Sequence, residues 1–427
     1  MFTFARGNSP LTKSGKLKVF FTVLSAGFAL AALYCCVSGA LHGYKFPYGS
    51  LLFNSERQFG DFYDNWFKWQ YDRQFLLSRS ALTVLPLGNV LMYAFSRINP
   101  AWTALFIFSA LGAAFFVCYC FWGTGRLSFA VRAAAVIALC GLCYPFLFTL
   151  DRGNMQLYYF MLVSAFLYAY SRGAYAVAAA IFGFSLGLKP FHIVFAVLFV
   201  ADRKYRELAA AFCVFALTAA GASALLAVWN GLTVNQFLHP DPGPKGNWTV
   251  SYHQAYVVGN NGLFFGHSVF GALKVVLMHF YNCGLFALGT VEELVERMAR
   301  PYFVAAAAGY LYAAWFVIRR ETVLWRRVAL LTVCMTALPF VSADYRLTLY
   351  LIPFFMFLNA PGENTDFVYS VLFGLVLIPK NYYFRVFSFV PPDTGLGIVA
   401  TPAVLLYFAW RLMRDRRFVT GAGVKAD

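Results

Sequence analysis

Long apolar segments constrain the fold of this chain more than any other feature. Runs such as "VFFTVLSAGFALAALYCCVSGAL" (19–41) and "AWTALFIFSALGAAFFVCYCFWG" (101–123) match the ~20 residues with which a helix crosses a bilayer. They lack the alternation of a barrel strand, and lipid accommodates only helices or closed barrels. Hydrophobic residues make up 61% of the 427 residues and charged residues 12%. The sequence therefore predicts an all-α polytopic membrane protein, one integral membrane domain over 1–427 with about 12 transmembrane helices.

Basic clusters at the ends of the apolar runs predict the orientation. Lys and Arg collect on the cytoplasmic side of membrane proteins, so both termini are expected inside, and the net charge of +16 suits anionic lipid rather than nucleic acid. A first external loop is then expected over 42–80, and a long external loop with a juxtamembrane part over 229–300. The basic clusters are Arg6, Lys13, Lys16 and Lys18, "DRKYRE" (202–207), "RRETVLWRR" (319–327) and "RLMRDRR" (411–417).

Residues 81–96 leave the threading of the first half open. If they cross the membrane fully, "DRGN" (151–154) faces inward and Lys189 lies at mid-membrane inside the apolar run 174–201. If they only re-enter, "DRGN" and Lys189 both face outward, and Pro190 breaks the run. We favour the second threading, because a lysine at the bilayer centre costs ~2.5 kcal/mol or more and proline breaks a helix.

Under that threading, polar residues from distant segments converge on the external face, and ionisable groups at membrane depth are candidates for function. Simpler explanations exist for each residue alone. The segment that holds Asp61 and Asp64 could be an interfacial amphipathic helix, "DRGN" a capped turn, and Lys189 a snorkelling side chain. Loop histidines such as His253 and His267 are usually exposed to solvent. The candidate site residues are Asp61, Asp64, Arg152, Asn154, Lys189, His192, His253, Tyr345 and Arg346.

This set suits glycosyl transfer from a lipid-phosphate sugar. A carboxylate takes the proton of the acceptor hydroxyl as that hydroxyl attacks the anomeric carbon. The departing phosphate needs cations rather than an acid. Cys/His pairs with zinc spacing are lacking in the sequence, so we predict no metal site and no cofactor, with a divalent cation near Asp61 and Asp64 as the alternative.

Four segments together resemble glycosyltransferase family 87, which has the GT-C membrane architecture with external juxtamembrane helices and loops. "GDFYDNW" (60–66) is similar to its first-loop motif, and the segment from "LDRGNMQLYYF" to "GFSLGLKPFHIVF" (150–195) is similar to its central block. "YVVGNNGLFFGHSVFGAL" and "DYRLTLYLIPFF" resemble later motifs. The late loop departs from the family in reading "NNGLFFG" where the family has an N-Q-S-L pattern.

The resemblance implies an inverting, polyprenyl-phosphate-sugar-dependent hexosyltransferase, often a mannosyltransferase, of the bacterial cytoplasmic membrane. Its substrates would be a polyprenyl-phosphate-linked sugar donor and a glycolipid or glycan acceptor, used on the external face. Asp61 matches the family's first-loop base, and Asp64 offers a second acid three residues on. Arg152 and Asn154 match the RG(Q/N) positions, and Lys189 matches the lysine of the small-residue helix.

Two other functions remain alternatives. A transporter or flippase for lipid-linked glycans would show two related halves with broken helices at corresponding positions, and no such repeat is visible. An oligosaccharide ligase or polymerase would depend on Arg and His in late loops rather than on an early acidic motif. Replacement of Asp61 therefore distinguishes the transferase from both.

Overall fold

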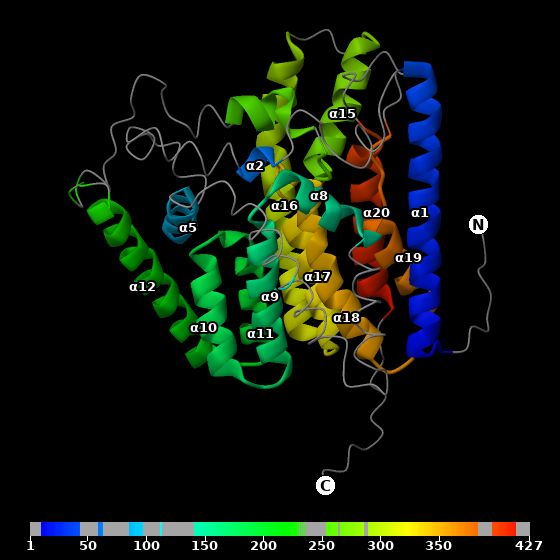
Figure 1. Cartoon of the computed structure of the whole chain (residues 1–427). Helices are drawn as coiled ribbons and strands as arrows, with labels where there is room; N and C mark the ends of the chain where they lie inside the picture. Colours follow the sequence, from blue (N-terminus) through cyan, green and yellow to red (C-terminus); the bar gives the residue numbers. More distant parts are fainter. Residues whose placement is uncertain are drawn as a thin grey trace.

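A computed structural model describes most of the chain and shows a bundle of helices (Figure 1). No strand occurs in the described ranges, where a single antiparallel bridge joins Gly266 to Ala343, so the all-α prediction is confirmed for this part of the chain. Asp64 lies outside the described residues, as does most of 63–140. The described residues are 10–42, 59–62, 85–96, 112, 141–229, 231, 233, 235, 253–263, 265–285, 289–382 and 395–415.

The described elements are helices of three to 30 residues. In the first half they are α1 (Lys13–His42), α2 (Gly60–Phe62), α5 (Pro86–Ser96), α8 (Tyr144–Arg152), α9 (Gln156–Ser171), α10 (Tyr175–Leu186), the 3₁₀ helix η5 (Pro190–Phe195), α11 (Ala196–Ala201) and α12 (Tyr205–Trp229). In the second half they are the π-helix η6 (His253–Val258), η7 (Asn260–Gly262), α15 (Val269–Asn282), α16 (Val291–Arg319), α17 (Leu324–Ala337), η8 (Asp344–Tyr350), α18 (Leu351–Asn359), α19 (Asp366–Leu377) and α20 (Gly397–Arg414).

Three of the described helices are long and apolar enough to cross a membrane: Lys13–Ala40, Tyr205–Trp229 and Val291–Arg319. Their outward faces carry exposed apolar side chains such as Leu217 and Leu311, as expected of surfaces in contact with lipid. Several further apolar helices are shorter. The described residues therefore support an integral membrane protein but do not confirm the count of about 12 spans.

The central helices run up and down, so that alternate connections lie at opposite ends of the bundle (Figure 1). The α8–α9 and α10–η5 connections, which hold Asn154 and Lys189, lie at one end together with α2. The α9–α10 and α11–α12 connections lie at the other end, and the latter contains the basic segment 202–207. The helix α5 has 11 described residues, about 16 Å of rise. This arrangement matches the threading in which Lys189 and "DRGN" share a face.

The chain reverses at Pro190, where the sequence predicts a break in the apolar run. Lys189 has an extended backbone (φ −148°, ψ 130°) and Pro190 opens η5 as its first residue, a position where the missing N–H costs nothing. Small residues then bring the following helices close. A Cβ on Gly183 would lie 2.1 Å from the Ala211 carbonyl oxygen, so α10 and α12 meet almost backbone to backbone.

Ion pairs tie the helices together at the end away from Lys189. Lys16 and Asp366, 1% and 2% exposed, approach to 3.3 Å, and the Lys16 ammonium also donates to backbone carbonyls of Phe357 and Ala360. Arg326 pairs with Glu363 at 2.8 Å. Arg327 pairs with Asp202 at 2.6 Å, and Arg411 pairs with Asp415 at 2.6 Å at the end of α20. We call these four pairs the basal ion pairs.

Candidate functional site

Asp61 and the "DRGN" turn meet at the other end of the bundle. Arg152, the last residue of α8, donates from Nη2 to Asp61 Oδ1 at 2.5 Å. Asn154, in the turn that follows α8, donates from Nδ2 to Asp61 Oδ2 at 2.6 Å. The Arg152 and Asp61 side chains are 12% and 22% exposed, so the pair is mostly buried but remains in contact with solvent. Segments about 90 residues apart thus form one cluster around a single carboxylate.

The local sequence explains why this turn can present two side chains to Asp61. Gly153 adopts the left-handed conformation (φ 60°), and the N–H groups of Gly153 and Asn154 donate to the Leu150 and Thr149 carbonyls, which closes a Schellman turn. A Cβ at Gly153 would lie 2.6 Å from the Phe59 ring, so glycine also permits close contact. The Phe59 N–H donates to the Asp151 carbonyl at 2.7 Å, which fixes α2 beside the turn.

Lys189 extends the cluster from the α10–η5 connection. Its Nζ lies 3.5 Å from Asn154 Oδ1, and 5.8 Å from the centroid of the Tyr345 ring. Lys189 stands in a turn, outside the helical segments, where burial and then the charge of Arg346 lower the pKa of its ammonium to about 8, against the opposing effect of Asp61. The ammonium therefore remains mostly protonated at neutral pH.

Arg346 adds a third cation from η8. Its guanidinium carbon lies 3.9 Å from the centroid of the Phe191 ring, and its Nη1 donates to the Val341 carbonyl at 3.3 Å. The side chain is 9% exposed, and its Nε has no hydrogen-bond partner in the described part of the chain. Neither Arg346 nor Lys189 forms an ion pair with a described carboxylate.

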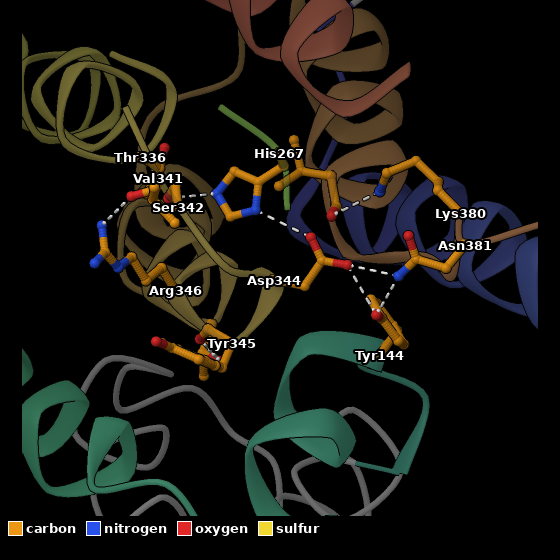
Figure 2. A network of polar contacts seen from close by, with 12 residues as sticks. Tyr144, His267, Thr336, Val341, Ser342, Asp344, Tyr345, Arg346, Lys380 and Asn381 are labelled. Carbon is orange, nitrogen blue, oxygen red and sulfur yellow. Dashed lines mark hydrogen bonds and ion pairs between the residues drawn. The ribbon is translucent and has the colours of Figure 1, made fainter. Parts of the chain in front are cut away.

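A buried polar network holds the start of η8 in place (Figure 2). Asp344 Oδ2 accepts from the Tyr144 hydroxyl (2.8 Å) and from Asn381 Nδ2 (2.7 Å), and Oδ1 pairs with His267 Nδ1 (3.0 Å). The Asp344 N–H donates to the Phe265 carbonyl at 2.9 Å. The network therefore connects the first residue of α8 to the segment that carries Tyr345 and Arg346.

Within this network, Ser342, His267 and Asp344 stand as in a hydrolytic triad. Ser342 Oγ lies 2.9 Å from His267 Nε2, and the Asp344 carboxylate, as an acceptor, fixes the proton on Nδ1. Ser342 and His267 are fully buried, and Asp344 is 3% exposed. A nucleophile needs access to its substrate, and Ser342 is buried. The three residues therefore stabilise the segment at the start of η8 and do not act as a catalytic triad. The sequence-based expectation of an exposed His267 is wrong.

The other predicted site residues lie apart from the Asp61 cluster. His192 is fully buried against Tyr159 and Phe182, with Nε2 2.6 Å from Ser185 Oγ. His253 opens η6 and pairs with Glu296 of α16 at 2.8 Å, both partly exposed. The His192 ring lies near the Lys189 backbone, but its side-chain partner is Ser185, and Asp64 lies outside the described residues. Their roles stay predictions.

Sequence reasoning missed Tyr144 and Asn381 entirely. Tyr144 precedes Pro145 in "CYPF", and Asn381 lies two residues after Pro379 in "IPKN", where a polar side chain at a helix end has many ordinary explanations. Among the described residues, no group of three His, Cys, Asp or Glu side chains is arranged to hold a metal ion. The expectation of a metal-independent site therefore stays a prediction.

Comparison with known proteins agrees with the motifs. A model of glycosyltransferase family 87 matches residues 80–343, well over half of the chain and including Arg152, Asn154 and Lys189. The match begins after Asp61 and ends just before Asp344. No curated protein matches the chain significantly. The family predicted from the sequence is thus confirmed: this chain belongs to glycosyltransferase family 87 and is a membrane glycosyltransferase.

Proposed function

We propose that the protein transfers a hexose, such as mannose, from a polyprenyl-phosphate donor to a glycolipid or glycan acceptor. The transfer inverts the anomeric configuration and takes place at the end of the bundle that holds Asp61. The observation that carries this proposal is the cluster of one carboxylate with Arg152, Asn154 and Lys189. A carboxylate beside cations meets both needs of the reaction, a proton acceptor for the hydroxyl and positive charge for the phosphate.

The chemical step uses these groups as follows. Asp61 takes the proton of the acceptor hydroxyl while that oxygen forms a bond to the anomeric carbon, opposite the phosphate. The bond from the anomeric carbon to the phosphate oxygen breaks, and its electron pair stays on the phosphate. Arg152 and Lys189 are the cations that stabilise this leaving group, and Arg346 adds charge nearby.

The external location is supported by the arrangement of charge. The basic segments at 13–18, 202–207, 319–327 and 411–414 lie at the end of the bundle that holds the basal ion pairs. The positive-inside rule puts that end in the cytoplasm, and hence Asp61 and Lys189 at the opposite, periplasmic surface of the bacterial cytoplasmic membrane. A lipid-anchored phosphate lies at the same surface, at the boundary between headgroups and hydrocarbon.

The direct test is an assay with the purified full-length chain. The protein would be incubated with a panel of polyprenyl-phosphate sugars and membrane lipid extracts, and products would be identified by mass spectrometry. We expect a glycosylated product with at least one donor, and none when nucleotide sugars replace the lipid-linked ones. Transfer from nucleotide sugars alone, or no transfer from any polyprenyl-phosphate sugar, would reject the proposal.

A further inference from the structure

Asp61 is engaged in the structure with the cation that its proposed role assigns to the donor phosphate. One carboxylate oxygen accepts from Arg152 at 2.5 Å and the other from Asn154 at 2.6 Å. A general base must turn a lone pair toward the acceptor hydroxyl, and a cation in contact with it opposes the arrival of a proton. In this state Asp61 serves as the counter-ion of Arg152.

Among the described residues, the surroundings of the pair hold more cations than carboxylates to match them. Lys189 and Arg346 make no ion pair with a described carboxylate, and each acts electrostatically on the other. Arg346 is 9% exposed and leaves its Nε without a partner among the described residues. Buried, unmatched cations are costly, which indicates that an anion completes this place. A phosphodiester brings one negative charge and several acceptor oxygens.

The guanidinium of Arg152 packs against Gly60 of α2 and is partly exposed. A Cβ on Gly60 would lie 3.1 Å and 3.2 Å from its two terminal nitrogens, so the absence of a side chain at Gly60 is what lets the guanidinium lie this close to α2. The pair is partly exposed, with side-chain exposures of 12% and 22%, and an anion can therefore reach it. Arginine binds phosphate and carboxylate with the same planar fork of donors, so either anion satisfies it.

We propose that Asp61 and the donor phosphate compete for Arg152, so that binding of the donor releases Asp61 to act as the base. This inference rests on the proposed function, because it takes the anion to be a polyprenyl-linked phosphate. The exchange forms and breaks no covalent bond: Arg152 leaves the carboxylate for the phosphate, and the net charge of the cluster falls by the one charge of the phosphodiester. The donor then binds first, and the acceptor hydroxyl meets a base only when the leaving group is in place.

Competition makes an unusual prediction, namely that loss of the base strengthens donor binding. The probe is a short, sugar-free prenyl phosphate, and its Kd is measured with the full-length protein in detergent. We expect Asp61→Asn to bind this probe about tenfold more tightly than the wild type, the factor that ~1.4 kcal/mol of lost competition gives. Asp202→Asn, which neutralises a carboxylate 2.6 Å from Arg327 among the basal ion pairs, is the matched control and should leave the Kd unchanged.

A double variant separates competition from the general effect of removing a negative charge. In an Arg152→Gln background, competition for Arg152 cannot occur, so adding Asp61→Asn should no longer tighten binding. If the gain persists in that background, or if Asp61→Asn leaves the affinity unchanged or weaker, the exchange is wrong. Asp61→Ser serves as a second neutral variant, and a melting curve for each variant establishes that it is folded.

Failure of the exchange is distinguishable from failure of the proposed function. If the protein does not use a polyprenyl-phosphate donor, the wild type binds the prenyl phosphate no more tightly than it binds inorganic phosphate or a plain alkyl alcohol. If the donor class is right and the exchange is wrong, the wild type binds the probe selectively, and the Asp61 variants show no gain that depends on Arg152.

Discussion

The two ends of the bundle treat their charged residues in opposite ways. At the basal end, Lys16 and Asp366 are almost completely buried, and each of the basal ion pairs matches a cation with a carboxylate. At the Asp61 end, Arg152 pairs with Asp61, whereas Lys189 and Arg346 form no ion pair with a described carboxylate, and one buried nitrogen of Arg346 lacks a described partner. Charges that are matched within the protein hold helices together, whereas unmatched charges indicate a ligand. The difference locates the site better than any residue alone.

The largest expected effect is on turnover at the Asp61 end. Asp61→Asn removes the proton acceptor and should lower turnover by about 10³-fold, within the range that general bases contribute. The melting temperature should change little, because Asn can still accept from Arg152. Turnover is measured as product formed per folded molecule. Full activity in Asp61→Asn would end the assignment of Asp61 as the base, and Asp202→Asn, its control, should retain turnover close to that of the wild type.

The reverse pattern is expected at the basal end. Asp366→Asn leaves the buried Lys16 ammonium without its carboxylate and should cost about 3 kcal/mol of stability. Turnover per folded molecule should remain unchanged. The control is Glu296→Gln, which removes a partly exposed partner of His253 and should shift stability by less than about 0.5 kcal/mol. Thermal unfolding in detergent measures both, and a selective loss of turnover in Asp366→Asn would erase the contrast between the ends.

A change in the Asp344 network should affect both stability and donor binding. Asp344→Asn replaces an acceptor of three side-chain hydrogen bonds by an amide, and should cost about 1–3 kcal/mol of stability. It should also raise the donor KM more than it lowers kcat, because Tyr345 and Arg346 follow Asp344 directly. Loss of stability with unchanged kinetics would assign the network to folding alone.

Lys189→Gln should weaken donor binding and leave the stability of the fold unchanged. It removes a cation that makes no ion pair with a described carboxylate, so we expect the donor KM to rise about tenfold, the equivalent of ~1.4 kcal/mol. Lys189→Arg keeps the charge and should restore most of the affinity. Steady-state kinetics at varied donor concentration gives both values, and equal KM values for Lys189→Gln and wild type would remove Lys189 from the phosphate site.

The smallest expected effect is a dependence of donor binding on pH. Lys189 has a pKa lowered to about 8, and only its protonated form attracts a phosphate. Donor affinity should therefore be full below that pH and decline as the pH rises through it. Among the described residues, Arg346, Asp61 and Tyr345 are ionisable groups that face Lys189, and the Lys189→Arg variant isolates the contribution of Lys189. A flat profile in the wild type would show that Lys189 keeps its charge throughout.

The sequence predicted the features that depend on short motifs or on the cost of placing polar groups in lipid. The all-α class follows from the apolar runs, and the reversal at Pro190 follows from the cost of burying Lys189 and from the missing N–H of proline. The cluster of Asp61, Arg152, Asn154 and Lys189 was predicted because all four lie in recognisable motifs on one predicted face. The structure brings them within hydrogen-bonding reach of one another.

The Asp344 network could not be predicted, for a physical reason. Tyr144 and Asn381 are 237 residues apart, and only tertiary packing brings them to the same carboxylate. His267 lies in a segment rich in Gly and Asn that is typical of an exposed loop, yet the bridge between Gly266 and Ala343 carries it into the interior. Burial of a single polar residue depends on its partners, and local sequence does not identify them.

Photo-crosslinking with a polyprenyl phosphate tests the contrast between the two ends most directly. The probe carries a photoreactive group on the carbon next to the phosphate, and labelled peptides from the full-length protein are identified by mass spectrometry. We predict labelling of the peptides that contain Arg152 to Asn154, Lys189 and Tyr345, with competition by unlabelled prenyl phosphate. Labelling that concentrates instead on the peptides of the basal ion pairs, around Lys16, Asp202 or Arg327, would contradict the assignment of the Asp61 end as the donor site.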